Sequence, residues 1–260
     1  MESENLVFDD GREVKMKLMS VITQWMFALL LSWHLCSLAD FFYPFFYTLL
    51  DISSHIDQFA PQNLYKSGFA LTSDSERFHL FSEIVSGVQH RCVLFGEISY
   101  FNGVKWETLL RRPEVIHLLD VRHLIDLFYF AGLWCGAFFL ASLFYLALMP
   151  RKRTFVVHKG LKHRWFWRVS AMFVAVSWLI WIGPTRVFYT LHEWVFPSDH
   201  QWMFSYQESL MTTLMKAPDL FAAIAVAVGM GMLVIGLLLG LIKRFLIDWQ
   251  PKTSVKQTSR

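Results

Sequence analysis

The chain has 260 residues, of which 55% are hydrophobic, 17% aromatic and 17% charged, and its formal net charge is +3. Soluble domains are about one quarter charged, so this composition excludes an ordinary soluble domain and predicts an all-α protein that crosses a membrane several times. The small net charge gives no reason to expect nucleic acid as a partner. The three cysteines, at positions 36, 92 and 135, are too few and too scattered for a disulfide framework or a cysteine-rich metal site.

The first apolar run covers residues 18–39 and follows a polar stretch, residues 1–17. A cleaved signal peptide is the alternative, but the run is longer than a signal core and no small-residue cleavage site follows it. We therefore predict a transmembrane helix here. The aromatic stretch Phe41–Tyr47 resembles an interfacial belt at the depth of lipid headgroups, with Pro44 ending or kinking the helix.

Most of the sequence outside the predicted membrane spans lies between residues 48 and 113, where charges of both signs occur without a long apolar run. Apolar residues at near-helical spacing, preceded by a Ser and acidic capping signal, predict an amphipathic helix over about 74–90. An Asn-Gly pair at 102–103, between apolar residues, predicts a short hairpin.

Basic residues set the expected topology. The segment 150–168 holds seven Lys or Arg residues and no acid, and such short loops remain in the cytoplasm. With residues 1–17 and the basic stretch from 243, the segments assigned to the cytoplasm hold 15 of the 24 basic residues. We predict one membrane domain, 18–249, with a cytoplasmic tail, 250–260.

Four transmembrane helices with both termini in the cytoplasm satisfy this count. The predicted spans are about 18–39, 125–149, 169–188 and 220–242, and the extracytoplasmic segments are about 40–124 and 189–219. In the last span, Gly236 and Gly240 have the spacing of a small-residue motif at which helices pack closely.

A helix start is predicted at Pro113, followed by Glu114, because proline and a carboxylate both suit a helix N-terminus. Glu114, His117 and Asp120 recur every three residues and so lie along one side of this helix, where the apolar span begins. A histidine there exchanges protons near neutral pH, and a neighbouring carboxylate can fix its tautomer. The alternative is that Glu114 only caps the helix and the other two are interfacial polar residues.

A second polar group follows the third predicted span and includes His192 and Glu193. Span counting places it on the same side of the membrane as His117, so the two histidines are expected to share one site. Arg186 lies at the end of that span and is either functional or extended to the interface. The H-E-x-x-H motif of zinc proteases is absent, since Phe196 stands at its last position. A metal site formed by His117, Asp120, His192 and Glu193 stays open as an alternative.

Several residues near and between the predicted spans occur in an order that resembles the sequence pattern of a known family. These residues are Glu114, His117, Asp120, Val121, His192, Phe196, Pro197, Trp202, Phe204, Ser209, Leu210 and Pro218. Their pattern is similar to that of the lipoprotein intramolecular transacylase (Lit) family of four-span bacterial membrane proteins. The likeness extends from the first predicted span to the fourth.

The resemblance implies an acyltransferase that moves the sn-2 acyl chain of a diacylglyceryl-modified cysteine to the α-amine of that cysteine, which gives a lyso-form lipoprotein. His117 and His192 are then the catalytic pair, with His117 oriented by Asp120 and with the roles of the two histidines exchangeable. The expected supporting residues are Asp120, Glu114, Arg186 and Glu193, and the expected substrate-binding residues are Phe196, Trp202 and Phe204.

The expected partners are a diacylated lipoprotein and membrane lipid, without a metal or other cofactor. The expected location is the bacterial cytoplasmic (inner) membrane, with the active site on its outer side. Two alternatives remain at this point: a non-enzymatic membrane scaffold and a metal-dependent membrane hydrolase.

Overall fold

The structure is a computed structural model that describes residues 2–89, 93–148 and 183–248. The described chain is mostly helical, with a single two-stranded sheet in these residues. The described residues divide into two compact units, one made of residues 2–34, 128–148 and 228–248 and the other of residues 35–89, 93–127 and 183–227. Three long helices, α1 (Glu2–Leu38), α5 (Arg112–Leu148) and α9 (Asp219–Asp248), contribute to both units.

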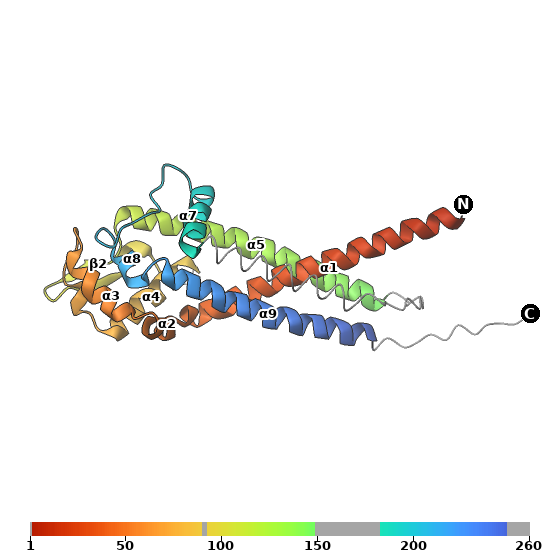
Figure 1. Cartoon of the computed structure of the whole chain (residues 1–260), viewed down its shortest axis with the longest axis horizontal. Helices are drawn as coiled ribbons and strands as arrows, with labels where there is room; N and C mark the ends of the chain where they lie inside the picture. The colour runs from red at the N-terminus through yellow and green to blue at the C-terminus, as the bar shows by residue number, and fades with distance from the viewer. Residues whose placement is uncertain (1, 90–92, 149–182, 249–260) are drawn as a thin grey trace, which may run out of the picture. The chain divides into compact units, whose positions relative to one another are not determined.

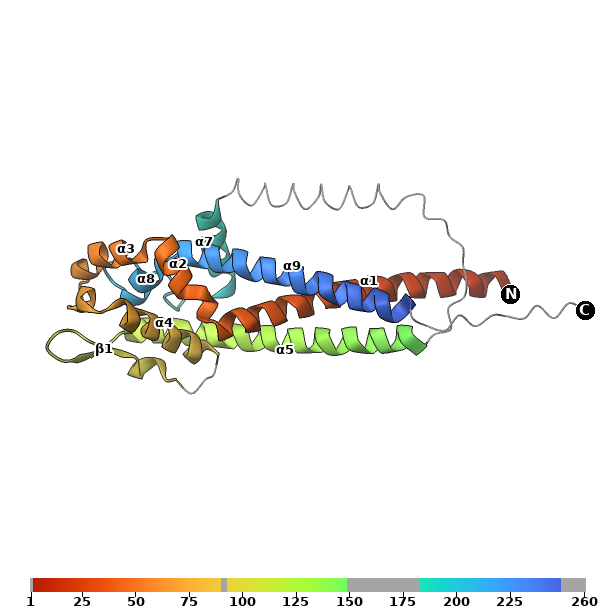
Figure 2. The same cartoon turned by 90° about the horizontal axis from the view of Figure 1, so that it is seen from below.

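In the first unit, α1, α5 and α9 lie side by side (Figures 1 and 2). Among the described residues, three segments are long and apolar enough to cross a membrane: Leu18–Leu38, Arg112–Tyr145 and Asp219–Leu246. Helices therefore occupy three of the four ranges predicted as spans.

The predicted third span, 169–188, lies outside the described residues as far as position 182. Residues 184–188, predicted to end the third span, are instead the start of a separate helix. Helix α7 (Pro184–Val195) starts after Gly183, whose φ of 90° is incompatible with a continuing helix. Proline in the first turn suits this new start, since it needs no hydrogen bond for its nitrogen.

Close packing in the first unit centres on a glycine of α9, as the small-residue motif predicted. A Cβ atom at Gly236 would overlap the Trp25 ring of α1, and the Gln24 side-chain nitrogen donates to the Gly236 carbonyl at 2.7 Å. Ser32 of α1 likewise donates to the Val228 carbonyl at 2.7 Å. Small residues let the two backbones approach, and the buried polar side chains of α1 use the carbonyl oxygens of α9 as acceptors.

The second unit contains the remaining elements. Its helices are α2 (Tyr43–Leu49), α3 (Ile52–Phe59), α4 (Asp74–Val88), α7 and α8 (Leu210–Met215), and its strands are β1 (Ser99–Phe101) and β2 (Trp106–Thr108). Short 3-10 turns cover Asp40–Phe42, Ala60–Gln62, Phe69–Leu71 and Phe95–Glu97. Both local predictions for this unit are confirmed. Ser73 caps α4 by accepting from the Glu76 N–H, and an antiparallel hairpin turns at Asn102-Gly103, where Gly103 has φ 92°.

The prediction of an interfacial belt at Phe41–Tyr47 is wrong for most of that stretch. Phe41, Tyr43, Phe46 and Tyr47 are buried in the second unit, while Phe42 and Phe45 are exposed. The Tyr43 ring stacks on Phe81 of α4 with centroids 4.0 Å apart, and its hydroxyl donates to the Leu214 carbonyl at 2.7 Å. These rings are therefore core residues, because helices from later in the chain cover them.

Pro44 also has a different role from the one predicted. Helix α1 ends at Leu38, and Asp40, Phe41 and Phe42 then turn the chain with φ of 45°, 50° and 59°. Pro44 follows in the first turn of α2. Proline is favoured in a first turn because no intrahelical bond is lost there, so it begins the second helix and does not end the first.

A buried guanidinium joins the N-terminal part of the second unit. Arg77 of α4 is 3% exposed and donates to the Tyr47 hydroxyl at 2.8 Å, while Tyr47 donates to Asp74 at 2.6 Å. Arg77 also bonds Asp57 of α3 at 3.3 Å. A buried cation is stable only when acceptors surround it, so this network requires α2, α3 and α4 to keep one arrangement.

Candidate functional site: a histidine pair among aromatic rings

The second unit brings together the two histidines singled out in the sequence. His117 lies in the second turn of α5, and His192 lies in the last turn of α7. Their ring centroids are 6.1 Å apart, with 33° between the ring planes. His117 is only 8% exposed and His192 is half-buried, so the pair is partly enclosed.

Aromatic side chains form the surroundings of this pair. Phe196 lies 4.7 Å from His117 and 5.1 Å from His192, measured between ring centroids. Phe204 is 6.1 Å from His117, and Trp202 is 5.2 Å from His192. All three aromatic residues expected to bind substrate therefore contact the pair. Burial among these rings lowers the pKa of His192 below its usual value, so this imidazole is neutral at neutral pH.

A backbone contact sets the tautomer of His192. Its Nδ1 lies 2.7 Å from the carbonyl oxygen of Phe188, one turn earlier in α7. A carbonyl only accepts hydrogen bonds, so Nδ1 carries the hydrogen and donates it. In the neutral ring Nε2 then keeps its lone pair. The structure thus presents His192 as a proton acceptor at Nε2.

Asp120 does not orient His117, contrary to the prediction. Its Oδ2 lies 2.6 Å from Nδ1 of His200, in the loop that follows α7. The Nδ1 of His117 is buried, and no hydrogen-bond partner for it occurs among residues 2–89, 93–148 and 183–248. The fold brings His200 to Asp120 from 80 residues away. A hydrogen bond between this carboxylate and a protonated imidazole is stronger than one between Asp120 and a neutral His117 would be.

Glu114 caps α5, as the sequence predicted, and has a second role that it did not show. The carboxylate is completely buried and accepts the backbone N–H of Arg111 at 2.6 Å. It also accepts the hydroxyl hydrogen of Ser209, which itself caps α8 by accepting from the Thr212 N–H at 2.9 Å. Glu114 therefore joins the start of α5 to the start of α8.

The other two expected supporting residues lie away from these contacts. Arg186 and Glu193 are exposed on α7. Neither has a hydrogen bond or an ion pair with another residue in the described part of the chain.

The alternative metal site is not formed by the described residues, which contain no group of three or more His, Cys, Asp or Glu side chains able to hold an ion. Asp120 is engaged with His200, and Glu193 is turned to the surface. The four residues proposed as ligands are thus separated into different contacts.

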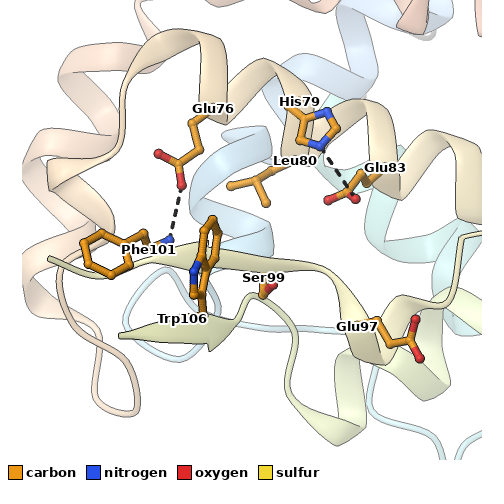
Figure 3. A pocket seen from close by; sticks show the side chains of 8 residues that line it. All are labelled: Glu76, His79, Leu80, Glu83, Glu97, Ser99, Phe101 and Trp106. Atoms are coloured by element: carbon orange, nitrogen blue, oxygen red, sulfur yellow. Dashed lines mark hydrogen bonds and ion pairs between the residues drawn. The ribbon is translucent and has the colours of Figure 1, made fainter. Parts of the chain in front are cut away.

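Hollows open on the described surface of the second unit. One of about 270 Å³ borders the histidine site, because it shares Asp120 and Phe196 with it; the other lining residues are His123, Leu124, Leu127, Val195 and Pro197. The second, of about 370 Å³, lies between α4 and the hairpin (Figure 3). There Glu76 accepts the Phe101 N–H at 3.2 Å and Glu83 pairs with His79 at 3.7 Å, so these acids stabilise local structure.

The contact between His200 and Asp120 predicts a pH-dependent stability. The bond to Asp120 raises the pKa of His200 above its usual value. Its contribution is therefore complete below the ordinary histidine pKa and is lost as pH rises through the raised one. The melting temperature of His200→Gln is expected to fall below that of the unsubstituted protein at pH 5.5 and to approach it by pH 9. A difference that widens with rising pH would contradict the ion pair.

The fold and the site together define a helical membrane protein with a partly enclosed pair of histidines suited to proton transfer. The family model of the lipoprotein intramolecular transacylase Lit matches residues 18–217. The chain therefore belongs to the lipoprotein intramolecular transacylase family. It is accordingly an acyltransferase of the membrane, as the sequence pattern indicated.

Solved structures agree with this family. The chain is similar to the membrane integral lipoprotein intramolecular transacylase Lit from Bacillus cereus, with a TM-score of 0.60 and 16% identity over 95% of this chain and 97% of that one. That structure has one histidine replaced by arginine. A second structure of the same protein, with this histidine replaced by alanine, gives the same TM-score over 94% of this chain. At this identity the likeness shows a shared fold. No curated protein matches the chain in sequence.

Proposed function

We propose that this transacylase moves the sn-2 acyl chain of a diacylglyceryl-modified cysteine to the α-amine of the same cysteine, with His117 and His192 as its acid–base pair. The observation that supports this most directly is the partly enclosed approach of the two rings, with centroids 6.1 Å apart. Aminolysis of an ester requires proton removal from the amine and proton delivery to the departing alkoxide, and two imidazoles perform both near neutral pH.

The hydrogen bond of His192 supports one assignment of the roles that the sequence left exchangeable. Its Nε2 accepts a proton from the substrate ammonium, since Nδ1 is committed to the Phe188 carbonyl. The freed amine attacks the ester carbonyl, and the new C–N bond forms a tetrahedral intermediate. When the ester C–O bond breaks, His117 takes the second proton from the nitrogen and delivers a proton to the departing glycerol oxygen. The first proton leaves His192 for solvent, which restores the neutral pair.

Partial enclosure and intramolecularity both favour this reaction. The amine and the ester belong to one molecule, so binding once positions both reacting groups. The aromatic residues Phe196, Trp202 and Phe204 keep the surroundings of the pair apolar, and they are the side chains proposed to hold the lipid part of the substrate.

The proposed setting is the bacterial inner membrane, with four spans, both termini in the cytoplasm and the histidine pair on the outer side. The support is the concentration of basic residues in the segments assigned to the cytoplasm. The proposed partners are diacylated lipoproteins and surrounding membrane lipid.

Mass spectrometry of a lipopeptide tests the reaction directly. Purified protein in detergent is expected to convert a synthetic diacylglyceryl-cysteine peptide to an isomer of equal mass, with one fatty acid on the α-nitrogen and one on glycerol. Fragment ions locate the moved chain. The matched control is the same lipopeptide with its amine acetylated, which should remain unchanged. Absence of the N-acylated product from the free-amine peptide would refute the proposed reaction.

A further inference from the structure

The charged side chain of Arg111 lies near Phe204, one of the aromatic residues around the histidine pair, and has no role in the proposed proton transfers. This residue directly precedes α5, and its carbonyl accepts the Val115 N–H at 3.0 Å, in the pattern of the helix. Its guanidinium carbon lies 4.4 Å from the centre of the Tyr65 ring and 5.9 Å from that of Phe204. Only 18% of the side chain is exposed, so the cation is held between two rings.

Two of the donors of Arg111 are buried and make no hydrogen bond within the part of the chain that the structure describes. These donors are Nε and Nη2, and both are inaccessible to solvent. Oε2 of Glu114 forms an ion pair with Nε at 3.5 Å but no hydrogen bond with it, and this oxygen already accepts the Arg111 backbone N–H at 2.6 Å. Buried donors without acceptors are rare and cost about 1–3 kcal/mol, or more when charged, so a missing acceptor is expected.

The shape of this unused edge indicates the kind of acceptor. The Nε–H and one Nη2–H of a guanidinium point in parallel from the same edge, which suits an oxygen atom with two lone pairs or a pair of oxygens. A carbonyl oxygen satisfies this edge in an apolar site without introducing another charge.

The order of residues along α5 indicates which part of the substrate reaches Arg111. Arg111, Glu114 and His117 follow each other every three residues, and about 9 Å of helix axis separates the first from the last. Phe204 borders both ends, 5.9 Å from the guanidinium and 6.1 Å from the His117 ring. The uncharged run from Leu127 to Leu148 lies beyond His117 in the other direction. A lipid whose chains follow that run and whose amine meets the histidines has its peptide part near Arg111.

We propose that Arg111 is a positioning residue that binds the carbonyl oxygen of the lipid-modified cysteine through Nε–H and Nη2–H. That carbonyl and the reacting amine are attached to the same Cα, so fixing the oxygen fixes the direction in which the amine points. The inference rests on the transacylase reaction proposed above and adds the group by which the enzyme recognises the peptide end of its substrate.

Two substrates and two variants test the assignment. The first substrate is the diacylglyceryl-cysteine peptide, and the second is S-diacylglyceryl-cysteamine, which has the same amine and esters but lacks the cysteine carbonyl. The variant Arg111→Lys keeps the positive charge beside Glu114 and removes the parallel donors. The control is Arg122→Lys, since Arg122 also lies over a ring, 4.7 Å from the centre of Phe95, and also has an unpartnered buried Nε.

The unsubstituted enzyme is expected to show a kcat/KM about 10- to 100-fold higher for the peptide than for the cysteamine compound, the range given by a charged hydrogen bond. Arg111→Lys should lose most of this preference, mainly through a higher KM for the peptide, and should retain its rate on the cysteamine compound within about threefold. Arg122→Lys should keep the preference. The cysteamine rate also reports whether each variant is folded.

Three results overturn the assignment. They are equal loss of both rates in Arg111→Lys, a preference that persists in that variant, and an unsubstituted enzyme that does not distinguish the two compounds. Arg111→Gln is measured beside Arg111→Lys, so that one poorly folded variant does not decide the outcome. If the unsubstituted enzyme converts neither compound, the proposed reaction itself is refuted, which separates the two failures.

Discussion

Replacement of either histidine by alanine is expected to lower the rate of lipopeptide conversion by about 10³-fold or more. The general acid and the general base each contribute about 10²- to 10⁴-fold in enzymes that use positioned side chains. His192→Ala removes the Nε2 acceptor, and His117→Ala removes the proposed proton donor at the departing oxygen. Initial rates of N-acyl product, measured by mass spectrometry at saturating lipopeptide, check both variants.

The matched control for these variants is His79→Ala. His79 is largely exposed on α4 and pairs with Glu83 at 3.7 Å, so its loss is expected to leave the rate unchanged within about twofold. Melting temperatures near that of the unsubstituted protein would show that the inactive variants are folded. Full conversion by both His117→Ala and His192→Ala would refute the assignment of the pair while leaving the family membership in place.

Local signals in the sequence were enough to predict several elements. The Ser73 cap and the spacing that follows predicted α4, the Asn-Gly pair predicted the hairpin, and Pro113 with Glu114 predicted the start of α5. Each of these depends on residues within about one helical turn of each other, where capping and turn preferences act. The shared location of His117 and His192 was also predicted, because counting spans assigns the same side of the membrane to both.

Contacts between distant segments were not predictable in this way. The partner of Asp120 is 80 residues away, and the acceptor of the Tyr43 hydroxyl is 171 residues away. No local pattern distinguishes a tyrosine of an interfacial belt from one that later helices bury. Likewise, the sequence showed that Glu114 suits a helix start, but only the fold shows that Ser209 donates to it. The wrong predictions for Asp120 and for the aromatic belt have this common origin.

Two kinds of residue surround the histidine pair: aromatic residues that contact it, and polar residues that hold the segments carrying it. The other rings that contact His117 and His192 come from α7 and from the loop between Phe196 and Phe204, and they set the polarity of the site. The polar residues Glu114, Ser209, Asp120 and His200 do not contact the pair by hydrogen bonds; they hold the segments that carry it. We therefore expect activity to depend also on residues that have no part in the proposed proton transfers.

Glu114→Ala is expected to destabilise the protein by about 3 kcal/mol and to reduce conversion as well. The substitution removes the acceptor for the Arg111 N–H and the Ser209 hydroxyl, and it leaves both donors in a buried site. Breaking a buried charged contact from one side costs about 3–5 kcal/mol, because the remaining groups are uncompensated. Thermal unfolding of the purified protein in detergent, followed by tryptophan fluorescence, measures the loss.

The matched control is Glu193→Ala, since Glu193 is exposed on α7 and its replacement should change the stability by no more than about 0.5 kcal/mol. Glu114→Gln should fall between the two, because the amide keeps one acceptor oxygen and the volume of the side chain. The same series separates the two roles of the carboxylate. A loss of conversion that follows the loss of stability across Gln and Ala assigns Glu114 to holding α5 on α8. Equal stability of Glu114→Ala and Glu193→Ala would mean that the buried contact with Ser209 does not stabilise the fold.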